Sequence, residues 1–149
     1  MSHRDRKRIL YFQQDNCYGA TESYISTLAE YFKDKFNVAV IYPDISSLEP
    51  FGNISGVMSL PLMKGKFSGS LIQNAYPITR AIRSFNPDIG HCNDPSLVGI
   101  ITSKLASAQN IVVTHHTSEL NIKYGWKGTI AKKFAFKLAD FFIFTSGHD

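Results

Sequence analysis

Short apolar runs alternate with stretches of helical periodicity along the whole chain, and this alternation limits the possible folds more than any other feature. The runs Ile9–Phe12, Val38–Tyr42 and Ile111–Thr114 lack the polar alternation of a half-exposed strand, so they indicate strands buried on both faces. Buried strands joined by helices require right-handed crossovers and a parallel sheet. The sequence therefore predicts an α/β fold with one parallel sheet and helices on both of its faces.

The boundaries of the elements follow from apolar spacing, caps and prolines. Strands are predicted at Arg8–Phe12, Val38–Tyr42, Val57–Leu60, Asp88–His91, Ile111–Thr114 and Phe141–Thr145. Helices are predicted after an N-cap at Thr21, across Leu71–Phe85 with a kink or break at Pro77, from Pro95 to about Ala108, and across Thr129–Ala139. In the third helix, Val98, Ile101 and Leu105 are expected to face the core.

Length and composition fit a single cytoplasmic domain. The chain has 149 residues, 44% of them hydrophobic and 19% charged, so it can bury one core and is not a disordered or collagenous chain. No apolar run approaches the roughly 20 residues of a membrane span, and Met1–Arg8 lacks the apolar segment of a secretory leader. Only two cysteines are present, which fits a reducing compartment. We expect one domain over residues 1–149, located in the cytoplasm.

Polar and reactive residues gather after three of the predicted strands. They are Asn16, Gly19 and Glu22 after the first strand, His91, Asn93 and Asp94 after the fourth, and Thr114, His115, His116, Thr117 and Glu119 after the fifth. Ligands of open α/β sheets bind outside the carboxyl ends of the strands, near the point where the strand order reverses. The three groups are therefore expected to share one functional edge of the sheet.

The same loops exclude several common sites. The loop Gln13–Ala20 has one glycine instead of a dinucleotide fingerprint, and the chain has neither a P-loop nor a nucleophile elbow. Cys17 and Cys92 would approach each other if the first and fourth strands are neighbours, but their spacing matches no zinc pattern. We interpret both cysteines as small buried hydrophobes and expect no metal.

Four segments share a further pattern. They are Tyr18-Gly19-Ala20-Thr21-Glu22, then Asn86-Pro87-Asp88-Ile89-Gly90-His91-Cys92-Asn93-Asp94, then Ile111-Val112-Val113-Thr114-His115-His116-Thr117, and finally Leu138-Ala139-Asp140-Phe141-Phe142-Ile143-Phe144-Thr145-Ser146. Together they resemble, in order and spacing, four motifs in the N-terminal domain of GT-B-fold glycosyltransferases, most closely family 4. The family motifs are G-G-x-E, P-D-[VI]-[VI]-H-x-H-[DN], V-x-T-x-H-[GD] and A-D-x-[VI]-[IV]-x-[VT]-S. The resemblance implies a Rossmann-like sheet that forms one half of a GT-B fold.

The resemblance also implies roles for single residues. His116 is similar to the family's histidine that faces the reacting sugar, which implies a catalytic contact to the donor, with a structural hydrogen bond as the alternative. Gly19 and Ala20 would bring backbone amides to a phosphate at a helix N-terminus. Asp94 would contact acceptor hydroxyls, act as a base, or only cap a helix. The other residues implied in donor or acceptor binding are Asn16, Asn93, Thr117 and Glu119.

Three further polar residues have structural interpretations beside functional ones. Glu22 lies where it can complement the dipole of the first helix, or contact a ligand. His91 ends a buried strand, which favours a role in bracing the core. His115 would point to the opposite face from His116 if the strand continues, so we interpret it as structural.

The resemblance implies a partner domain as well. Family 4 enzymes hold the donor nucleotide mainly in a second domain with an E-x7-E motif, and no such segment follows Ser146. We expect these residues to be the acceptor-side domain of a retaining glycosyltransferase, inactive alone, that uses a nucleotide-sugar and a sugar, lipid or other acceptor. Its remaining partner would be the donor-binding domain. We expect no cofactor, no metal and no nucleic acid.

Two other function classes stay open at this stage. A sugar-nucleotide epimerase half-domain would need acid and base carboxylates, which Asp94 and Glu119 could supply in part. A non-enzymatic module could bind a partner, or the anionic surface of a membrane peripherally, through the last predicted helix. The basic and aromatic residues of that helix are Lys132, Lys133, Phe134, Phe136 and Lys137, with the two phenylalanines on different faces.

Overall fold

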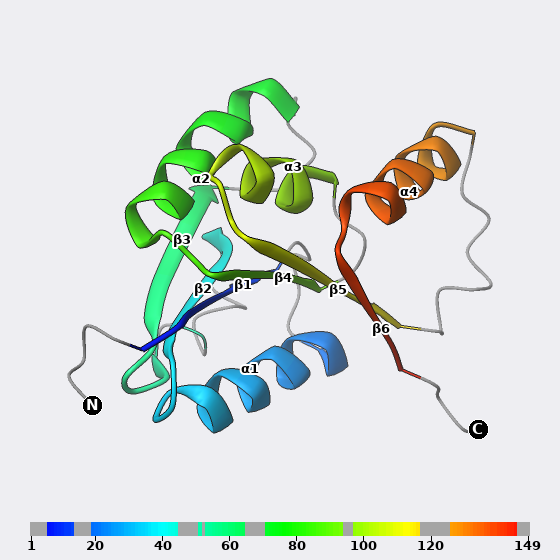
Figure 1. Ribbon diagram of the computed structural model, residues 1–149. Helices are drawn as coiled ribbons and strands as arrows, with labels where there is room; N and C mark the ends of the chain where they lie inside the picture. The colour runs from blue at the N-terminus through cyan, green and yellow to red at the C-terminus, as the bar shows by residue number, and fades with distance from the viewer. Residues whose placement is uncertain are drawn as a thin grey trace.

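Six parallel strands form one sheet in the computed structural model, which describes residues 6–13, 19–44, 51, 53–64, 71–93, 97–116 and 126–145 (Figure 1). The elements are β1 (Arg8–Phe12), α1 (Ala20–Phe32), β2 (Asn37–Asp44), β3 (Met58–Lys64), α2 (Leu71–Phe85), β4 (Ile89–Asn93), α3 (Leu97–Leu105), β5 (Asn110–His116), α4 (Trp126–Leu138) and β6 (Phe141–Thr145). The strand order is β3-β2-β1-β4-β5-β6. The predicted fold is confirmed, and β1 and β4 are neighbours in the sheet.

Helices cover the two faces of the sheet unequally. In Figure 1, α1 lies alone on one face, while α2, α3 and α4 lie on the other. Successive side chains of a strand point to opposite faces, so β1 supplies both cores. Leu10 and Phe12 face the side of α2 and α3, and Ile9 and Tyr11 face α1. Burial on both faces explains why the strand sequences are apolar without alternation.

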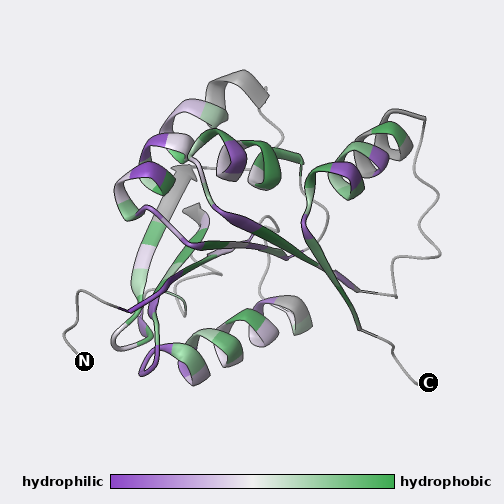
Figure 2. Cartoon of the chain, viewed as in Figure 1, coloured by the Kyte–Doolittle hydropathy of each residue, from purple (hydrophilic) through white to green (hydrophobic). Residues whose placement is uncertain are grey.

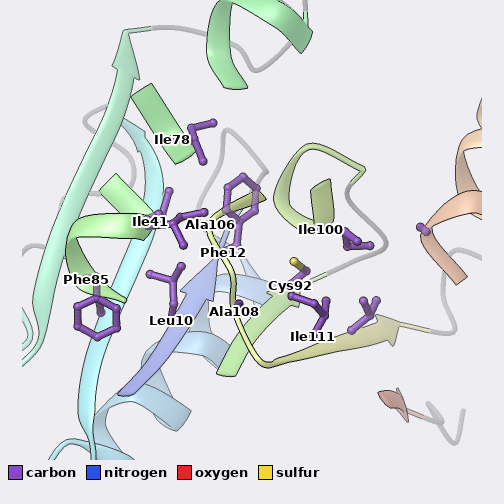
Figure 3. Packing of buried hydrophobic residues seen from close by; sticks show 14 residues of the cluster. Leu10, Phe12, Ile41, Ile78, Phe85, Cys92, Ile100, Ala106, Ala108 and Ile111 are labelled. Atoms are coloured by element: carbon purple, nitrogen blue, oxygen red, sulfur yellow. The ribbon is translucent and has the colours of Figure 1, made fainter. Parts of the chain in front are cut away.

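A close contact with the sheet determines which side of α3 is buried. Phe12 of β1 lies between Ile78 of α2 and Ile100 of α3 (Figure 3). A Cβ added to Gly99 would lie 2.7 Å from Phe12 Cδ1 and 3.0 Å from Cys92 Sγ, so only glycine allows this approach. The helix backbone therefore reaches the sheet at Gly99.

The predicted inner face of α3 is therefore wrong for Ile101 and Leu105, while Val98 packs against the core as predicted. The buried residues are Gly99, Ile100, Thr102 and Ser103, while Leu105 is 53% exposed. Val98 and Ile101 are only half-buried. Apolar spacing predicted the other side of the helix because a pattern of large apolar residues does not show where small residues allow the closest packing.

Pro77 does not break α2. The helix runs from Leu71 to Phe85 with Pro77 exposed inside it, so the predicted split is wrong, while the alternative of a kink stays a prediction. Burial of Ile78 and Ile82 against the sheet compensates for the hydrogen bond that proline cannot donate. The helix ends before Asn86, which has a left-handed φ of 52° that asparagine tolerates.

One predicted helix start and one predicted helix end differ from the structure. The N-cap of α1 is Gly19 rather than Thr21, because the Glu22 carboxylate accepts a hydrogen bond from the Gly19 N–H at 2.6 Å and fixes the turn there. The third helix is described only from Leu97, so its predicted start at Pro95 lies outside the described residues. It ends at Leu105, three residues before the predicted end.

The strand β6 at the edge of the sheet is apolar over most of its length (Figure 2). Phe141, Ile143 and Phe144 are all exposed, whereas Phe142 stacks on Phe136 of α4 with ring centroids 4.8 Å apart. Phe134 of α4 is exposed and Phe136 is half-buried, so the expectation that these two residues face different sides is confirmed.

Candidate functional site

The strand order reverses between β1 and β4, and the candidate site lies at the carboxyl ends of these two strands. From β1 the chain proceeds outward to β2 and β3, and from β4 it proceeds outward in the other direction to β5 and β6. Parallel α/β sheets bind ligands at such a switch point. The described residues that reach it are Gln13 after β1, Asn93 at the end of β4, and Gly19 and Glu22 at the start of α1.

A chain of hydrogen bonds joins these four residues. Asn93 Nδ2 donates to Gln13 Oε1 at 3.1 Å, and Gln13 Nε2 donates to Glu22 Oε1. The Gly19 N–H donates to Glu22 Oε2 at 2.6 Å. The chain therefore links the end of β4, through the residue after β1, to the first turn of α1.

The network is buried although most of its atoms are polar. Gln13 is fully buried, and Glu22 and Asn93 are each 2% exposed. Buried polar groups are costly unless they are hydrogen-bonded, and here each carboxylate oxygen of Glu22 has an N–H donor. Glu22 also lies in the first turn of α1, where the positive end of the helix dipole stabilises a carboxylate. The expected dipole role is thus combined with a hydrogen-bonding role.

Gly19 uses its backbone differently from the expectation. Its φ of −155° is extended and its N–H is bonded to Glu22, so the conformation does not depend on glycine. A Cβ at this position would meet Glu22 Oε2 at 3.4 Å, which is an ordinary contact. Contacts of Gly19 and Ala20 with a ligand remain a prediction.

His91 and Thr114 form a second polar pair beside the network. Their side chains share a hydrogen bond of 2.7 Å between Nε2 and Oγ1, and both residues are buried. The Tyr11 ring lies 5.2 Å from the His91 ring, and burial, with the nearby Tyr24, raises the pKa of Tyr11. His91 therefore braces the core between β1, β4 and β5, as expected.

The two histidines that end β5 are placed differently. His115 is 3% exposed and meets the rings of Phe136 and Phe144 edge-on at 6.2 and 6.1 Å, which confirms its structural interpretation. His116 is the last residue of β5 and pairs with Thr145, but its side chain lies outside the described part of the structure. Its catalytic role remains a prediction.

Four predicted site residues lie outside the described residues, namely Asn16, Asp94, Thr117 and Glu119. One residue of the network, Gln13, was not singled out from the sequence. The available signal was a polar residue directly after the apolar run Ile9–Phe12, but any loop residue gives the same signal. Only the pairing of β1 with β4 shows that Gln13 meets Asn93.

Cys92 fits the expectation for a buried hydrophobe. It is fully buried, and burial raises the pKa of its thiol to about 12. Cys17 lies outside the described residues. Among the residues that the structure describes, no three His, Cys, Asp or Glu side chains gather to hold a metal ion. None of the described helices is long and apolar enough to cross a membrane.

Comparison with known proteins identifies a family and a fold. The model of Glycosyltransferase Family 4 matches residues 21–148. The fold is similar to that of Anabaena HepE solved with UDP, with a TM-score of 0.69, 16% identity, and coverage of 91% of this chain and 36% of that chain. The HepE structure with UDP and glucose has a TM-score of 0.68 and 18% identity, and the match covers 91% of this chain and 37% of that chain. The HepE structure with UDP-glucose has a TM-score of 0.69 and 16% identity, with coverages of 91% and 36%. No curated protein sequence gives a match.

Proposed function

This chain belongs to glycosyltransferase family 4, and from that membership we propose that it is the acceptor-side domain of a retaining glycosyltransferase. The enzyme would move a sugar from a nucleotide-sugar to a sugar, lipid or other acceptor. The observation that carries the proposal is the match of the family model to residues 21–148, and the buried network of Gln13, Glu22 and Asn93 lies at the sheet edge where such folds bind ligands.

A nucleotide-sugar donor is supported by the solved structures with the same fold. HepE was solved with UDP and with UDP-glucose, and those ligands belong to HepE. At 16 to 18% identity the likeness establishes the fold alone, so the donor class is carried to this chain as part of the proposal.

In this mechanism the protein positions the reactants and stabilises developing charge, and no protein nucleophile is required. The backbone of Gly19 and Ala20 lies at the departing phosphate, with the Ala20 N–H facing it because the Gly19 N–H is bonded to Glu22, and His116 contacts the donor sugar. Asn93 and Asp94 hold acceptor hydroxyls, and Asn16, Thr117 and Glu119 supply further contacts to the donor or the acceptor. No metal or other cofactor takes part, so we expect EDTA to leave the transfer rate unchanged.

The donor nucleotide would be held by a second domain. The chain spans about 36% of the length of the HepE chains that it matches. We propose that residues 1–149 do not transfer sugar by themselves. The test is an assay of the purified chain with UDP-glucose and with other sugar nucleotides, and any turnover would contradict this part of the proposal.

Replacement of His116 tests the catalytic assignment. In the transferase assembled with a donor-binding domain, His116→Ala should lower kcat at least about a hundredfold, since one preorganised contact to the transition state is lost. Lys104→Ala is the control, because Lys104 is exposed and pairs with Asp140 away from the site. Equal rates for both variants would remove His116 from the reaction.

The outer surface of α4 favours a peripheral contact with an anionic membrane at the cytoplasmic face. Phe134 is 56% and Ile130 46% exposed, and Lys133 and Lys137 are exposed beside them. Apolar side chains next to lysines are the composition of interfacial helices. Liposome sedimentation with and without anionic lipid tests this contact, with Phe134→Ala as the weakened variant. Absence of binding at low salt would exclude it.

A further inference from the structure

We propose that Gln13 is a positioning residue of the transfer site, because its side-chain amide joins the end of β4 to the first turn of α1. The catalytic consequence rests on the proposed function, while the geometry does not. The Gln13 backbone is held separately, since its N–H donates to the Ile41 carbonyl of β2 at 2.8 Å. With the side-chain bonds to Asn93 and Glu22, one residue connects β2, β4 and α1.

The hydrogen bonds define the orientation of the Gln13 amide. Its Nε2 donates to Glu22 Oε1 and so faces Glu22. The Oε1 then faces the Nδ2 of Asn93. Because all three side chains are almost fully buried, water cannot replace a bond that is lost. The Gln13 amide therefore joins the Gly19 turn to the end of β4 directly.

Gln13 acts through the residues that it holds. The residues proposed to meet the ligands, Gly19, Ala20 and Asn93, lie on the two elements that the amide joins. A transition-state contact is sensitive to small displacements, so loosening the amide should lower the transfer rate. Gln13 itself has no proposed contact with the reacting atoms.

An exchange of amide and carboxylate tests the proposal. Gln13→Glu alone places two carboxylates against each other and should open the network. Combining it with Glu22→Gln restores complementary partners, because the new carboxylate at position 13 accepts from both Asn93 and the new amide at position 22. That amide still offers its oxygen to the Gly19 N–H. Gln109→Glu, at an exposed glutamine, is the matched control for the change in charge.

The readouts are hydrogen exchange of the Gly19 amide in the 15N-labelled chain and the transfer rate of the assembled transferase. In Gln13→Glu we expect Gly19 to exchange at least about tenfold faster, the effect of losing one hydrogen bond to a charged acceptor. The transfer rate should fall by a similar factor. In the double variant both should return to within about threefold of wild type, because the two changes are coupled.

Two results would overturn the proposal. One is a Gly19 exchange rate in Gln13→Glu that equals the rate in wild type and in the control. The other is a double variant that shows the sum of two independent losses. If Gln13→Glu does not fold, Gln13→Met, which removes the amide without adding charge, replaces it with the same expectation. Absence of transfer in wild type would count against the proposed function alone, since Gly19 exchange is measured without substrate.

Discussion

The carboxylates at the two edges of the sheet differ in their burial and in the groups that bind them. At the carboxyl edge, Glu22 is buried and its oxygens are held by neutral N–H groups. At the amino edge, Asp88 and Asp140 are partly exposed and pair with Lys7 and Lys104 at 3.1 and 3.0 Å. A buried carboxylate depends closely on its hydrogen bonds, whereas an exposed ion pair is screened by water and tolerates movement.

The same pair of hydrogen bonds, made by an aspartate, occurs at two strand pairs of the amino edge. Asp88, just before β4, donates its N–H to the Arg8 carbonyl and accepts the Arg8 N–H at 2.8 Å. Asp140, just before β6, exchanges the same two bonds with Ile111 of β5. These bonds hold the register of neighbouring strands.

The segments that resemble the family motifs contain residues with two different roles. In Asn86–Asp94, Asp88 belongs to the architecture at one edge, and Asn93 belongs to the candidate site at the other edge. The acid in Leu138–Ser146, Asp140, is architectural in the same way. Polar residues that look alike in the sequence thus lie at opposite ends of the strands, where some stabilise the fold and others belong to the candidate site.

The largest expected effect comes from removing the amide at the carboxyl edge. Gln13→Leu leaves the Glu22 carboxylate and the Asn93 amide without their shared partner, which should cost about 3 kcal/mol of the free energy of unfolding. Urea denaturation measures the loss, and Gln109→Leu at an exposed position should change stability little. A loss below about 1 kcal/mol would mean that the two edges do not differ as described.

A smaller and pH-dependent effect is expected at the amino edge. Burial alone would raise the pKa of Asp88, but the hydrogen bonds from Arg8 and Lys7 and their charges hold it below 3.8. The Ile111 N–H holds the pKa of Asp140 below 3.8 against the opposing effect of burial, with help from the hydrogen bond and charge of Lys104. A depressed pKa stabilises the fold above pH 3.8, and that stability is lost as the pH falls through the folded value.

The variant Asp88→Asn, Asp140→Asn tests this sign. It should be less stable than wild type at pH 7, by about 1 kcal/mol per site at most since both carboxylates are partly exposed. The difference should shrink below pH 3.8, where wild type takes up protons. Thermal melts from pH 7 to pH 2.5 measure it, and a difference that grows on acidification would contradict the assigned pKa shifts.

The smallest effect is expected for the lysines of the amino edge. The side chain of Lys7 is 66% exposed and that of Lys104 38%, so Lys7→Ala or Lys104→Ala should cost less than about 1 kcal/mol. This loss should disappear in high salt, because mobile ions screen exposed pairs. Chemical denaturation in low and high NaCl checks both points. A loss of stability that is the same in low and high salt would contradict the description of these ion pairs as exposed.

The fold was more predictable from the sequence than the candidate site was. Apolar runs such as Ile9–Phe12 identify strands directly, because burial on both faces removes polar residues. Gln13 could not be identified in this way, since its partners Glu22 and Asn93 lie 9 and 80 residues away. The inner face of α3 escaped prediction for a related reason, because the closeness of Gly99 to Phe12 is a property of packing and not of spacing.

The central claim is that ligands meet this chain at the carboxyl ends of β1 and β4. An amide-resolved NMR titration with UDP-glucose, on the transferase assembled from the 15N-labelled chain and an unlabelled donor-binding domain, tests it directly. We predict chemical-shift changes at Gly19, Ala20 and Asn93. The competing location is a hollow of about 410 Å³ at the amino edge, lined by residues that include Arg8, Asn37 and Ser84. Changes confined to that hollow, with the carboxyl edge unaffected, would contradict the account.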